Sequence, residues 1–372
     1  MSLLAHLATI DDPRRDINKK HELLDILFLT VSAVLSGAEG WKDIKDFGDE
    51  KLAWLRQYRP FENGMPVDDT IARVVRALDP EQFNRAFLNW VNEVRKTQGQ
   101  EQIALDGKTL RRSHDGEKDT ALHSITAWGH ERGLVLAQLK STGKKNEQDS
   151  VMAMLDLLQV QGAHITADAM NTQKKIARKI HKKQGDYTLS LKDNHKTLRK
   201  EISAYFHKVR RDTPKQIAVY EEVDGGHGRV EQRTCRQVPV NEWVRGAAQW
   251  PGLQTFIEME RERHLPGKDV EREIQYYISS LPVDARRVAQ GIRRHWEVEN
   301  KAHWVLDVAF KEDDSRIRKG DGAENVAIIR RFCLNLARLD PRKNSMRGKL
   351  KQAGWSDTRR AEILFGTDDQ YV

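Results

Sequence analysis

Two short apolar runs that each end in an aspartate constrain the fold of this chain more than any other feature. Residues 103–105 are followed by Asp106, and residues 165–167 are followed by Asp168. Apolar runs of this length that stop at a turn-forming residue are typical of buried strands, and Gly107 would let the backbone turn closely after the first. Either run alone fits an ordinary strand that ends in an aspartate turn. Together they indicate a sheet with two acids at one edge.

The segments around these runs indicate which kind of sheet this is. Residues 1–96 have helical periodicity, which predicts an all-helical N-terminal domain. Beyond about residue 100 the pattern predicts three antiparallel strands, a helix, a strand, a basic helix and a further strand, at 103–105, 123–128, 134–139, 151–158, 164–167, 171–183 and 187–191. That order is typical of a ribonuclease H-like core, so we expect an α/β (α+β) fold built on a mixed sheet with helices.

The rest of the chain interrupts this core and then completes it. Alternating segments predict a β-rich insertion at about residues 205–280, with strands near 217–223, 229–236, 255–260 and 274–278. Helical pattern returns at about residue 284. We therefore expect a helical domain at 1–96, a core at 97–340 that contains the insertion, and a basic C-terminal tail at 341–372. Outward arginines in the helical domain fit a DNA-binding unit and an ordinary bundle equally well.

The two aspartates are candidates for a metal site. They lie 168 − 106 = 62 residues apart, and the ends of neighbouring strands can bring such carboxylates within a few ångström of each other. Unpaired, Asp106 and Asp168 would repel, and each would raise the pKa of the other. A divalent cation removes that repulsion, and an all-oxygen ligand set favours Mg²⁺ or Mn²⁺ over zinc. We expect two Mg²⁺ ions, which Mn²⁺ can replace, arranged for phosphodiester chemistry.

A third carboxylate is expected from the helix that contains residues 294–307. Glu297 and Glu299 are two residues apart, so on a helix their side chains point roughly 200° apart and only one can face the sheet. Glu299 shares its face with apolar residues such as Leu306, whereas Glu297 shares its face with cations such as Lys301. We therefore predict Glu299 as the third acid. A glutamate in an intrahelical ion pair is the alternative.

Two histidines flank Glu299 on the same helix. His295, Glu299 and His303 span two helical turns, about 12 Å of rise, so the three side chains cannot easily reach one ion. A zinc site is therefore not expected, and each histidine is predicted to pack in the core or to contact a phosphate.

Cations are concentrated at the predicted edge of the sheet that carries the aspartates. They follow strands or begin helices there, at Lys108, Arg111, Arg112, Lys144, Lys145, Lys174, Lys175, Lys192 and Lys196. Such a set would follow a nucleic-acid backbone without reading its sequence. A solvated surface lysine is the alternative for any one of them.

Composition limits the class of protein. The chain has 372 residues and a net charge of +8, which allows a sizeable core and favours a polyanionic partner. Cys235 and Cys333 are too few for a disulfide framework, so we expect a reducing compartment. Residues 1–12 lack the pattern of a signal peptide, and the longest apolar stretch, 23–35, is too short to span a membrane. We expect no membrane contact.

Seven stretches of the chain resemble a known family. In chain order they are SGAEGWKDIKDFG, NGMPVDDTIARV, IALDGKTLRRS, ITADAMNTQKKIA, GDYTLSLKDNH, HGRVEQR and HWEVENKAHWVLDVAFKEDDSRIR. They are similar to the H-repeat-associated insertion-sequence transposases, a branch of the DDE transposases. The resemblance implies Asp106, Asp168 and Glu299 as the metal-binding acids, a helical N-terminal domain, and a β insertion before Glu299.

The helix that carries Glu299 departs from the pattern of related branches. Those branches have a tyrosine, an arginine, the catalytic glutamate and a lysine at positions that here hold Ile292, His295, Glu299 and Leu306. His295 is expected to take over the arginine's phosphate contact, and Lys301 or Lys311 to replace the lysine. The predicted DNA-binding set is Lys108, Arg111, Arg112, Lys145, Lys174, Lys192, Asn194, His295 and Lys301.

The resemblance implies a DNA transposase of the bacterial cytosol or nucleoid. Its partners would be double-stranded DNA, namely terminal inverted repeats and target DNA, and cleavage of two ends together implies a homodimer or a higher assembly. Two alternatives remain open. One is a metal nuclease of the same fold that cuts without joining, and the other is an inert DNA-binding relic. An inert relic is expected to have lost an acid, and this chain keeps all three.

Overall fold

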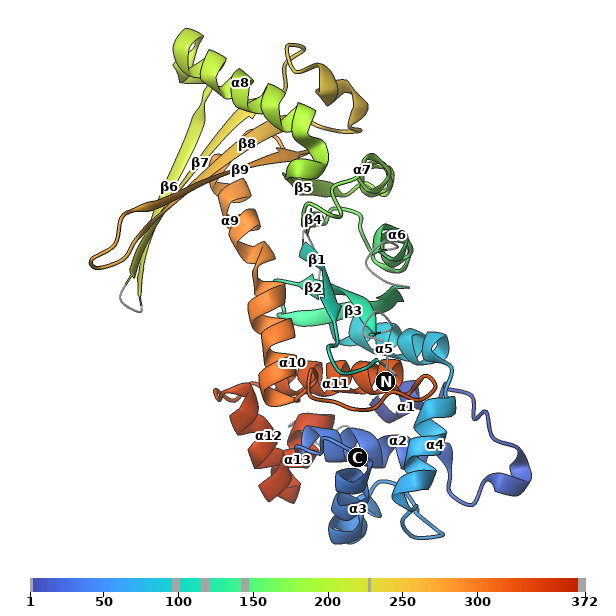
Figure 1. The fold of residues 1–372 in the computed structure, drawn as a ribbon. Helices are drawn as coiled ribbons and strands as arrows, with labels where there is room; N and C mark the ends of the chain where they lie inside the picture. The colour runs from blue at the N-terminus through green and yellow to red at the C-terminus, as the bar shows by residue number, and fades with distance from the viewer. Residues whose placement is uncertain (1–2, 96–100, 115–120, 142–146, 227–228, 367–372) are drawn as a thin grey trace.

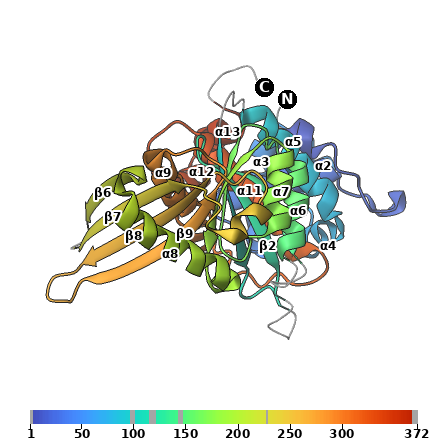
Figure 2. The ribbon, with the colours of Figure 1, turned by 90° about the horizontal axis from the view of Figure 1, so that it is seen from above.

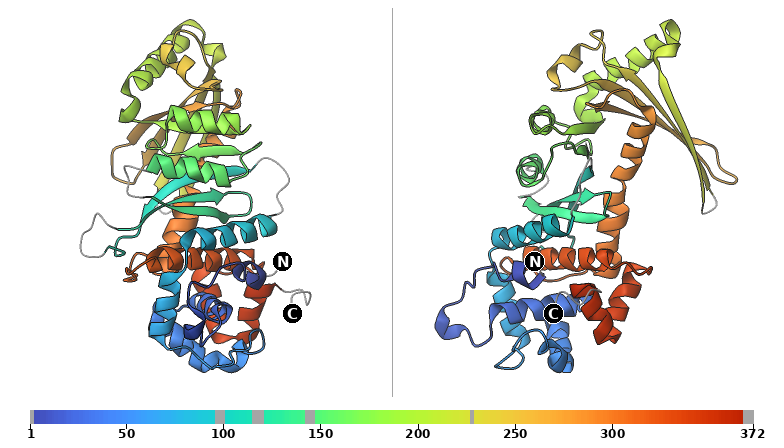
Figure 3. Two further views of the ribbon diagram at one scale, coloured as in Figure 1. Left: turned by 90° about the vertical axis from the view of Figure 1, so that its right-hand side faces the viewer. Right: turned by 180° about the vertical axis from the view of Figure 1, so that it is seen from behind.

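The computed structural model describes residues 3–95, 101–114, 121–141, 147–226 and 229–366. A single nine-stranded sheet runs through the molecule, and the helices of the two chain ends form a separate layer beside one end of it (Figures 1 and 3). Short 3₁₀ turns lie at η1 (Asp16–Asn18), η4 (Asp193–His195), η5 (Pro214–Gln216) and η6 (Arg245–Gln249). Within the described ranges, no helix is both long enough and apolar enough to cross a membrane.

The N-terminal residues form the predicted helices. They are α1 (Leu3–Leu7), α2 (Leu23–Leu35), α3 (Trp41–Leu55), α4 (Asp68–Ala77) and α5 (Pro80–Arg95). Helix α2 is apolar on every side and lies in the centre of this layer, buried along almost its whole length. Its one acid, Asp25, accepts hydrogen bonds from the Arg59 side chain and the Phe61 backbone N–H, which satisfies a buried charge.

The first five strands have the order that the sequence pattern predicted. They are β1 (Gln102–Thr109), β2 (His123–Gly129), β3 (Leu134–Ser141), β4 (His164–Ala167) and β5 (Asp186–Leu191), arranged as β3-β2-β1-β4-β5. Strands β1, β4 and β5 are mutually parallel, and β2 and β3 are antiparallel to their neighbours. Helices α6 (Glu147–Leu157) and α7 (Lys174–Lys182) provide the crossovers. The ribonuclease H-like mixed sheet is confirmed.

The register between β1 and β4 differs from the prediction in one useful way. Strand β1 does not turn after Asp106 but continues to Thr109, where it pairs with β2. Its pairing with β4 ends at Leu105 opposite Ala167. Asp106 and Asp168 are therefore the next residues along two neighbouring parallel strands, whose axes are about 4.8 Å apart in such sheets.

The predicted β-rich insertion continues the same sheet. It consists of β6 (Ala218–Gly226), β7 (Arg229–Pro239), β8 (Thr255–His264) and β9 (Glu271–Ser279), and β9 pairs with β5. Helix α8 (Lys196–Asp212) covers one face of this half, and α9 (Ala285–His295) lies against the other (Figure 2). Because β9 leads directly into α9, the insertion delivers the chain to the helix that carries Glu299.

The chain then returns to the helical layer. A π-helical segment, η7 (Val298–His303), is followed by α10 (Trp304–Ala309) and α11 (Gly322–Leu339), which packs on α2, α4, α5 and β3. The Asn335 side chain pairs with both the N–H and the C=O of Val135, so the outer edge of β3 is covered. The stretch expected to be a basic tail carries two helices, α12 (Met346–Trp355) and α13 (Asp357–Phe365), and both contact α2.

One buried ion pair joins the segment after α10 to α11 in the helical layer. Glu312 follows α10, Arg331 lies on α11, and both side chains are fully buried and joined by two hydrogen bonds. We expect Arg331→Met to lower the free energy of unfolding by about 3–5 kcal/mol, because the Glu312 charge would be left buried without a partner. Urea denaturation followed by circular dichroism measures this.

The matched control is Arg342→Met, which breaks the more exposed pair with Glu362. That loss should be below about 1 kcal/mol. Equal losses in the two variants would contradict a structural role for the buried pair.

Candidate metal centre

Three acids from distant parts of the chain line one cavity. The cavity holds about 310 Å³, and its wall includes Asp106 on β1, Asp168 after β4 and Glu299 on η7. The sheet supplies the two aspartates through the β1–β4 register, and the helix that follows the insertion lies across the strand ends. All three acids predicted from the sequence therefore face the same space.

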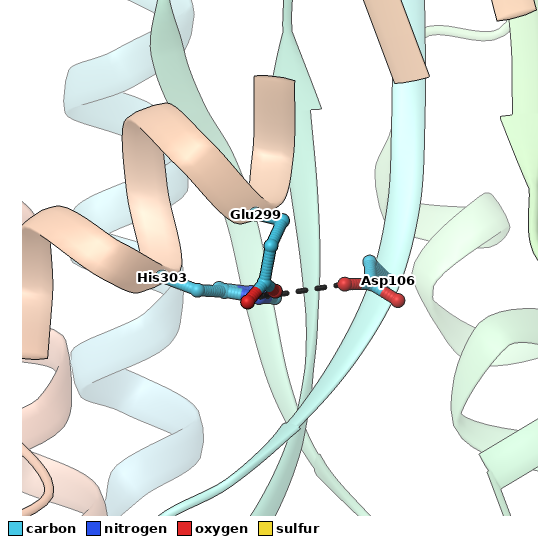
Figure 4. Close-up of side chains that lie close together, drawn as sticks. All are labelled: Asp106, Glu299 and His303. Atoms are coloured by element: carbon cyan, nitrogen blue, oxygen red, sulfur yellow. Dashed lines mark hydrogen bonds and ion pairs between the residues drawn. The ribbon is translucent and has the colours of Figure 1, made fainter. Parts of the chain in front are cut away.

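The π-helical segment sets which side chains of this helix face the cavity. In η7 the N–H of Trp304 bonds to the C=O of Glu299, five residues earlier, so the turn is wider than an α-turn. Val298 and Ala302 are buried on its inner side. Glu299 and His303 lie one turn apart and point toward β1, as Figure 4 shows. Local π geometry of this kind is frequent at functional sites.

His303 lies between two of the acids. Its Nδ1 is 3.2 Å from Glu299 Oε2 and 3.4 Å from Asp106 Oδ2, and its side chain is 3% exposed. The three donor atoms lie within 4.8 Å of one another. The two-turn span of His295, Glu299 and His303 argues against one ion shared by all three, but it allows a contact within each neighbouring pair, because the members of a pair are four residues apart. The sequence predicted a packing or phosphate-contacting role for His303 and missed its proximity to the acids.

Glu297 points away from the cavity. One of its oxygens lies 2.8 Å from Lys301 Nζ and the other lies 2.6 Å from His130 Nδ1. The Lys301 contact is an i,i+4 pair within the helix, and the His130 contact joins this helix to the residue that follows β2.

A buried chain of hydrogen bonds holds Asp168, and little in the sequence indicates it. Both the backbone N–H and the side-chain amide of Asn171 donate to Asp168 Oδ1. That amide also donates to Glu147 Oε1 at 2.6 Å, and His123 Nε2 lies 2.9 Å from Glu147 Oε2. The other ring nitrogen of His123, Nδ1, is 2.8 Å from the Thr109 hydroxyl. Asn171, three residues after Asp168, was the one available signal.

Glycine is needed at position 107 because there is little space for a Cβ atom, and not because the chain turns there. A Cβ at this position would lie 2.9 Å from Glu147 Oε2 and 3.0 Å from His123 Nε2. Any larger residue would push apart the pair that orients Asn171.

The electrostatics of the cavity favour a bound cation. Burial is the main cause that raises the pKa of Asp106 to about 6, and the charges of Asp168 and Glu299 add to it, while His303 opposes it. Burial also raises the pKa of Asp168, against the hydrogen bonds from Asn171. The hydrogen bond with His303 lowers the pKa of Glu299. Oxygen donors held this close and this poorly neutralised fit a hard divalent ion.

Most of the predicted DNA-contacting residues are accessible. Arg111 and Arg112 follow β1 with side chains 83% and 52% exposed. Lys174, Lys192, Asn194 and Lys301 are exposed as well, and Lys192 lines the cavity. His295 lines it too, with Nδ1 3.1 Å from the Thr166 hydroxyl, and burial lowers the pKa of His295 to about 4. Lys145 lies outside the described residues.

Lys108 is placed differently from the prediction. Its side chain is 8% exposed, and Nζ donates to both carboxylate oxygens of Asp307 at 2.5 and 2.6 Å. Asp313 is 3.5 Å away. Lys108 therefore ties β1 to α10 through Asp307. Its position two residues after Asp106 makes it a structural support of the centre.

Two of the three departures from the related branches are core positions. Ile292 packs with Tyr277 and Val288 under β7 and β8, and its side chain also reaches the cavity. Leu306 is fully buried. Both residues therefore close the interior behind the acids.

Comparison with known proteins identifies the family. Residues 97–336 match the family described as "Transposase DDE domain", and residues 4–91 match the one described as "DDE_Tnp_1-associated". The chain belongs to the DDE transposase family, with the fold and the acidic cavity described above.

Its relatives include H repeat-associated proteins. The chain is 39% identical over 98% of both chains to "H repeat-associated putative transposase YhhI" of Escherichia coli K12. It is 41% identical to "Putative transposase YncI" of E. coli O157:H7, over 91% of this chain and 87% of that one. A shorter relative, "Inactive transposase YbfQ" of E. coli K12, is 56% identical over 20% of this chain and 87% of its own. The H repeat-associated resemblance seen in the sequence is confirmed.

The raised pKa of Asp106 makes a prediction about stability without metal. Between about pH 4 and pH 6 the folded state keeps a proton that the unfolded state has released, so stability falls as pH rises through this window. Asp106→Asn removes this loss. In a metal chelator, we expect the free energy of unfolding of the variant, relative to that of wild type, to rise by about 1–3 kcal/mol from pH 4 to pH 7.5.

Urea denaturation at the two pH values measures the gain. Asp16→Asn is the control, because the Asp16 side chain is 96% exposed. If the stability difference between Asp106→Asn and wild type does not change with pH, the pKa of Asp106 is not raised in the metal-free fold.

Proposed function

We propose that this protein cleaves DNA at the ends of a mobile element and joins the freed 3′-hydroxyl to target DNA. Asp106, Asp168 and Glu299 are the catalytic acids in this proposal, and they hold two Mg²⁺ ions that Mn²⁺ can replace. The observation that carries it is the β1–β4 register, which sets two acids side by side, together with a third acid that lines the same cavity. Family membership supports the general reaction class.

The chain's own residues give the centre its rigidity. Two neighbouring parallel strands fix the spacing of Asp106 and Asp168, and the Asn171–Glu147 pair fixes the rotation of the Asp168 carboxylate. Bound divalent ions would supply the Lewis acidity that activates the attacking oxygen and stabilises the leaving oxygen. Partial burial of Asp106 and Asp168 limits the screening of their charges by bulk water, whereas Glu299 lies at the exposed side of the cavity.

The exposed cations would hold the DNA strand over the cavity. Arg111 and Arg112 follow β1. Lys192 follows β5, and Lys174 begins α7. They would neutralise phosphates, which fixes the position of the backbone without reading its sequence. Recognition of the inverted repeats would then need a further surface, and the helical layer is our proposal for it. If both ends of the element are cleaved together, at least two copies of the chain act on the DNA, and they would do so in the bacterial cytosol.

Substitution of the acids tests the catalytic assignment. We expect Asp106→Asn, Asp168→Asn and Glu299→Gln each to lower Mg²⁺-dependent cleavage of a substrate with the matching inverted repeats by about 100-fold or more. The reason is that each acid contributes to transition-state charge stabilisation worth several kcal/mol. Gel assays of nicked and joined products measure both steps.

Glu297→Gln is the matched control, because Glu297 lies two residues from Glu299 but pairs with Lys301 and His130. It should keep most of the activity. Cleavage that survives Asp106→Asn would overturn the assignment. Cleavage by wild type without joined products would instead favour a nuclease that does not transfer strands.

The exposed cations are tested by the salt dependence of DNA binding. Lys192→Ala should weaken binding for all DNA sequences and reduce the slope of log K against log salt by about one. Lys183→Ala is the control, because its Nζ donates to carbonyl groups of the segment around α6. An unchanged slope in Lys192→Ala would remove Lys192 from the DNA contact surface.

A further inference from the structure

We propose that His303 is a direct nitrogen ligand of the cation held between Asp106 and Glu299. That half of the centre would then be a mixed nitrogen and oxygen site, with a preference for Mn²⁺ over Mg²⁺. This inference rests on the proposed function in one respect, namely that the acids bind divalent ions at all. It goes beyond the three-acid assignment by adding a fourth ligand and a metal preference.

The distances fit a shared ion. Two donor atoms that bind one ion at about 2.1–2.2 Å lie about 3.0 Å apart at a right angle and about 3.5 Å apart at a tetrahedral angle. His303 Nδ1 is 3.2 Å from Glu299 Oε2 and 3.4 Å from Asp106 Oδ2. These two separations are those of ligands around a single ion, and the third, between the two carboxylates, is within 4.8 Å.

The described polar contacts of the ring are all with the two acids. The His303 side chain is 3% exposed, and Nε2 has no hydrogen-bond partner within the described part of the chain. Its Nδ1 faces the carboxylates of Asp106 and Glu299, and all three side chains converge in Figure 4. A histidine needed only for packing would not aim its polar edge at two acids while an apolar residue could fill the same space.

The ligand type sets the metal preference. Mg²⁺ is bound through oxygen and keeps several waters, whereas imidazole nitrogen suits borderline transition ions, for which affinity rises from Mn²⁺ onward. Within the described residues, the side chain hydrogen-bonded to the Asp168 carboxylate is that of Asn171, and no histidine nitrogen is bonded to it. The centre would therefore be asymmetric, with one position suited to Mg²⁺ and the other to Mn²⁺.

Pulsed electron paramagnetic resonance of Mn²⁺ bound to the full-length protein tests this without any activity measurement. We expect a ¹⁴N coupling from a directly bound imidazole in wild type and its loss in His303→Gln. Mn²⁺ affinity should fall about 10-fold or more in that variant, since even residues that only orient a ligand contribute 10–100-fold. Mg²⁺ affinity, measured by competition with Mn²⁺, should fall less than about 3-fold.

His295→Gln is the matched control. His295 lines the same cavity, but its Nδ1 is 3.1 Å from the Thr166 hydroxyl. This variant should keep the ¹⁴N coupling. Thermal unfolding of both variants in chelator shows whether each is folded, and His303→Asn, which is smaller, replaces His303→Gln if that variant is not.

The outcomes separate this inference from the proposed function. Bound Mn²⁺ without ¹⁴N coupling in wild type would overturn the nitrogen ligand and leave the three acids in place. Loss of the coupling in His295→Gln but not in His303→Gln would overturn it too. Absence of any Mn²⁺ binding by wild type at millimolar concentration would overturn the metal centre itself.

Discussion

The parallel pairing of β1 with β4 is the constraint on which the rest of the centre depends. Because the ladder ends with Leu105 opposite Ala167, the next residue of each strand is an aspartate, and the two carboxylates are forced together. A one-residue slip would turn one of them to the other face of the sheet. The core strands are buried, so that slip would also expose apolar side chains, and the fold therefore holds two like charges in a position they would not adopt alone.

The third acid is positioned by a second set of contacts along the same strand. Gln102, at the start of β1, donates to the backbone C=O of Gly291, and Lys108, near its end, binds Asp307. Six residues of strand span about 20 Å, and sixteen residues of helix span about 24 Å. The strand and the helix are thus fastened at both ends over nearly equal lengths, and Glu299 and Asp106 meet in the middle.

The sequence predicted the core strands and their order, and it indicated three acids that the fold brings to one cavity, because each depends on local pattern. Alternation and apolar runs mark the strands, and helical spacing separates Glu299 from Glu297. The buried partners of Asp168 were missed, since Glu147 and His123 carry no pattern that links them across 24 residues. Lys108 was assigned to DNA because it stands beside other cations. Its partner, Asp307, lies 199 residues later, and only the fold brings them together.

The sequence by itself determined the type of fold and the chemical type of the site, since strand periodicity and carboxylates at strand ends are local properties of the chain. Tertiary structure decided which polar groups surround those carboxylates. It brought His303 between two of them through a wider helical turn, joined the insertion to the central sheet, and placed two helices of the expected tail against α2. Contacts between residues distant in the chain follow from how the elements pack, and no local spacing specifies that packing.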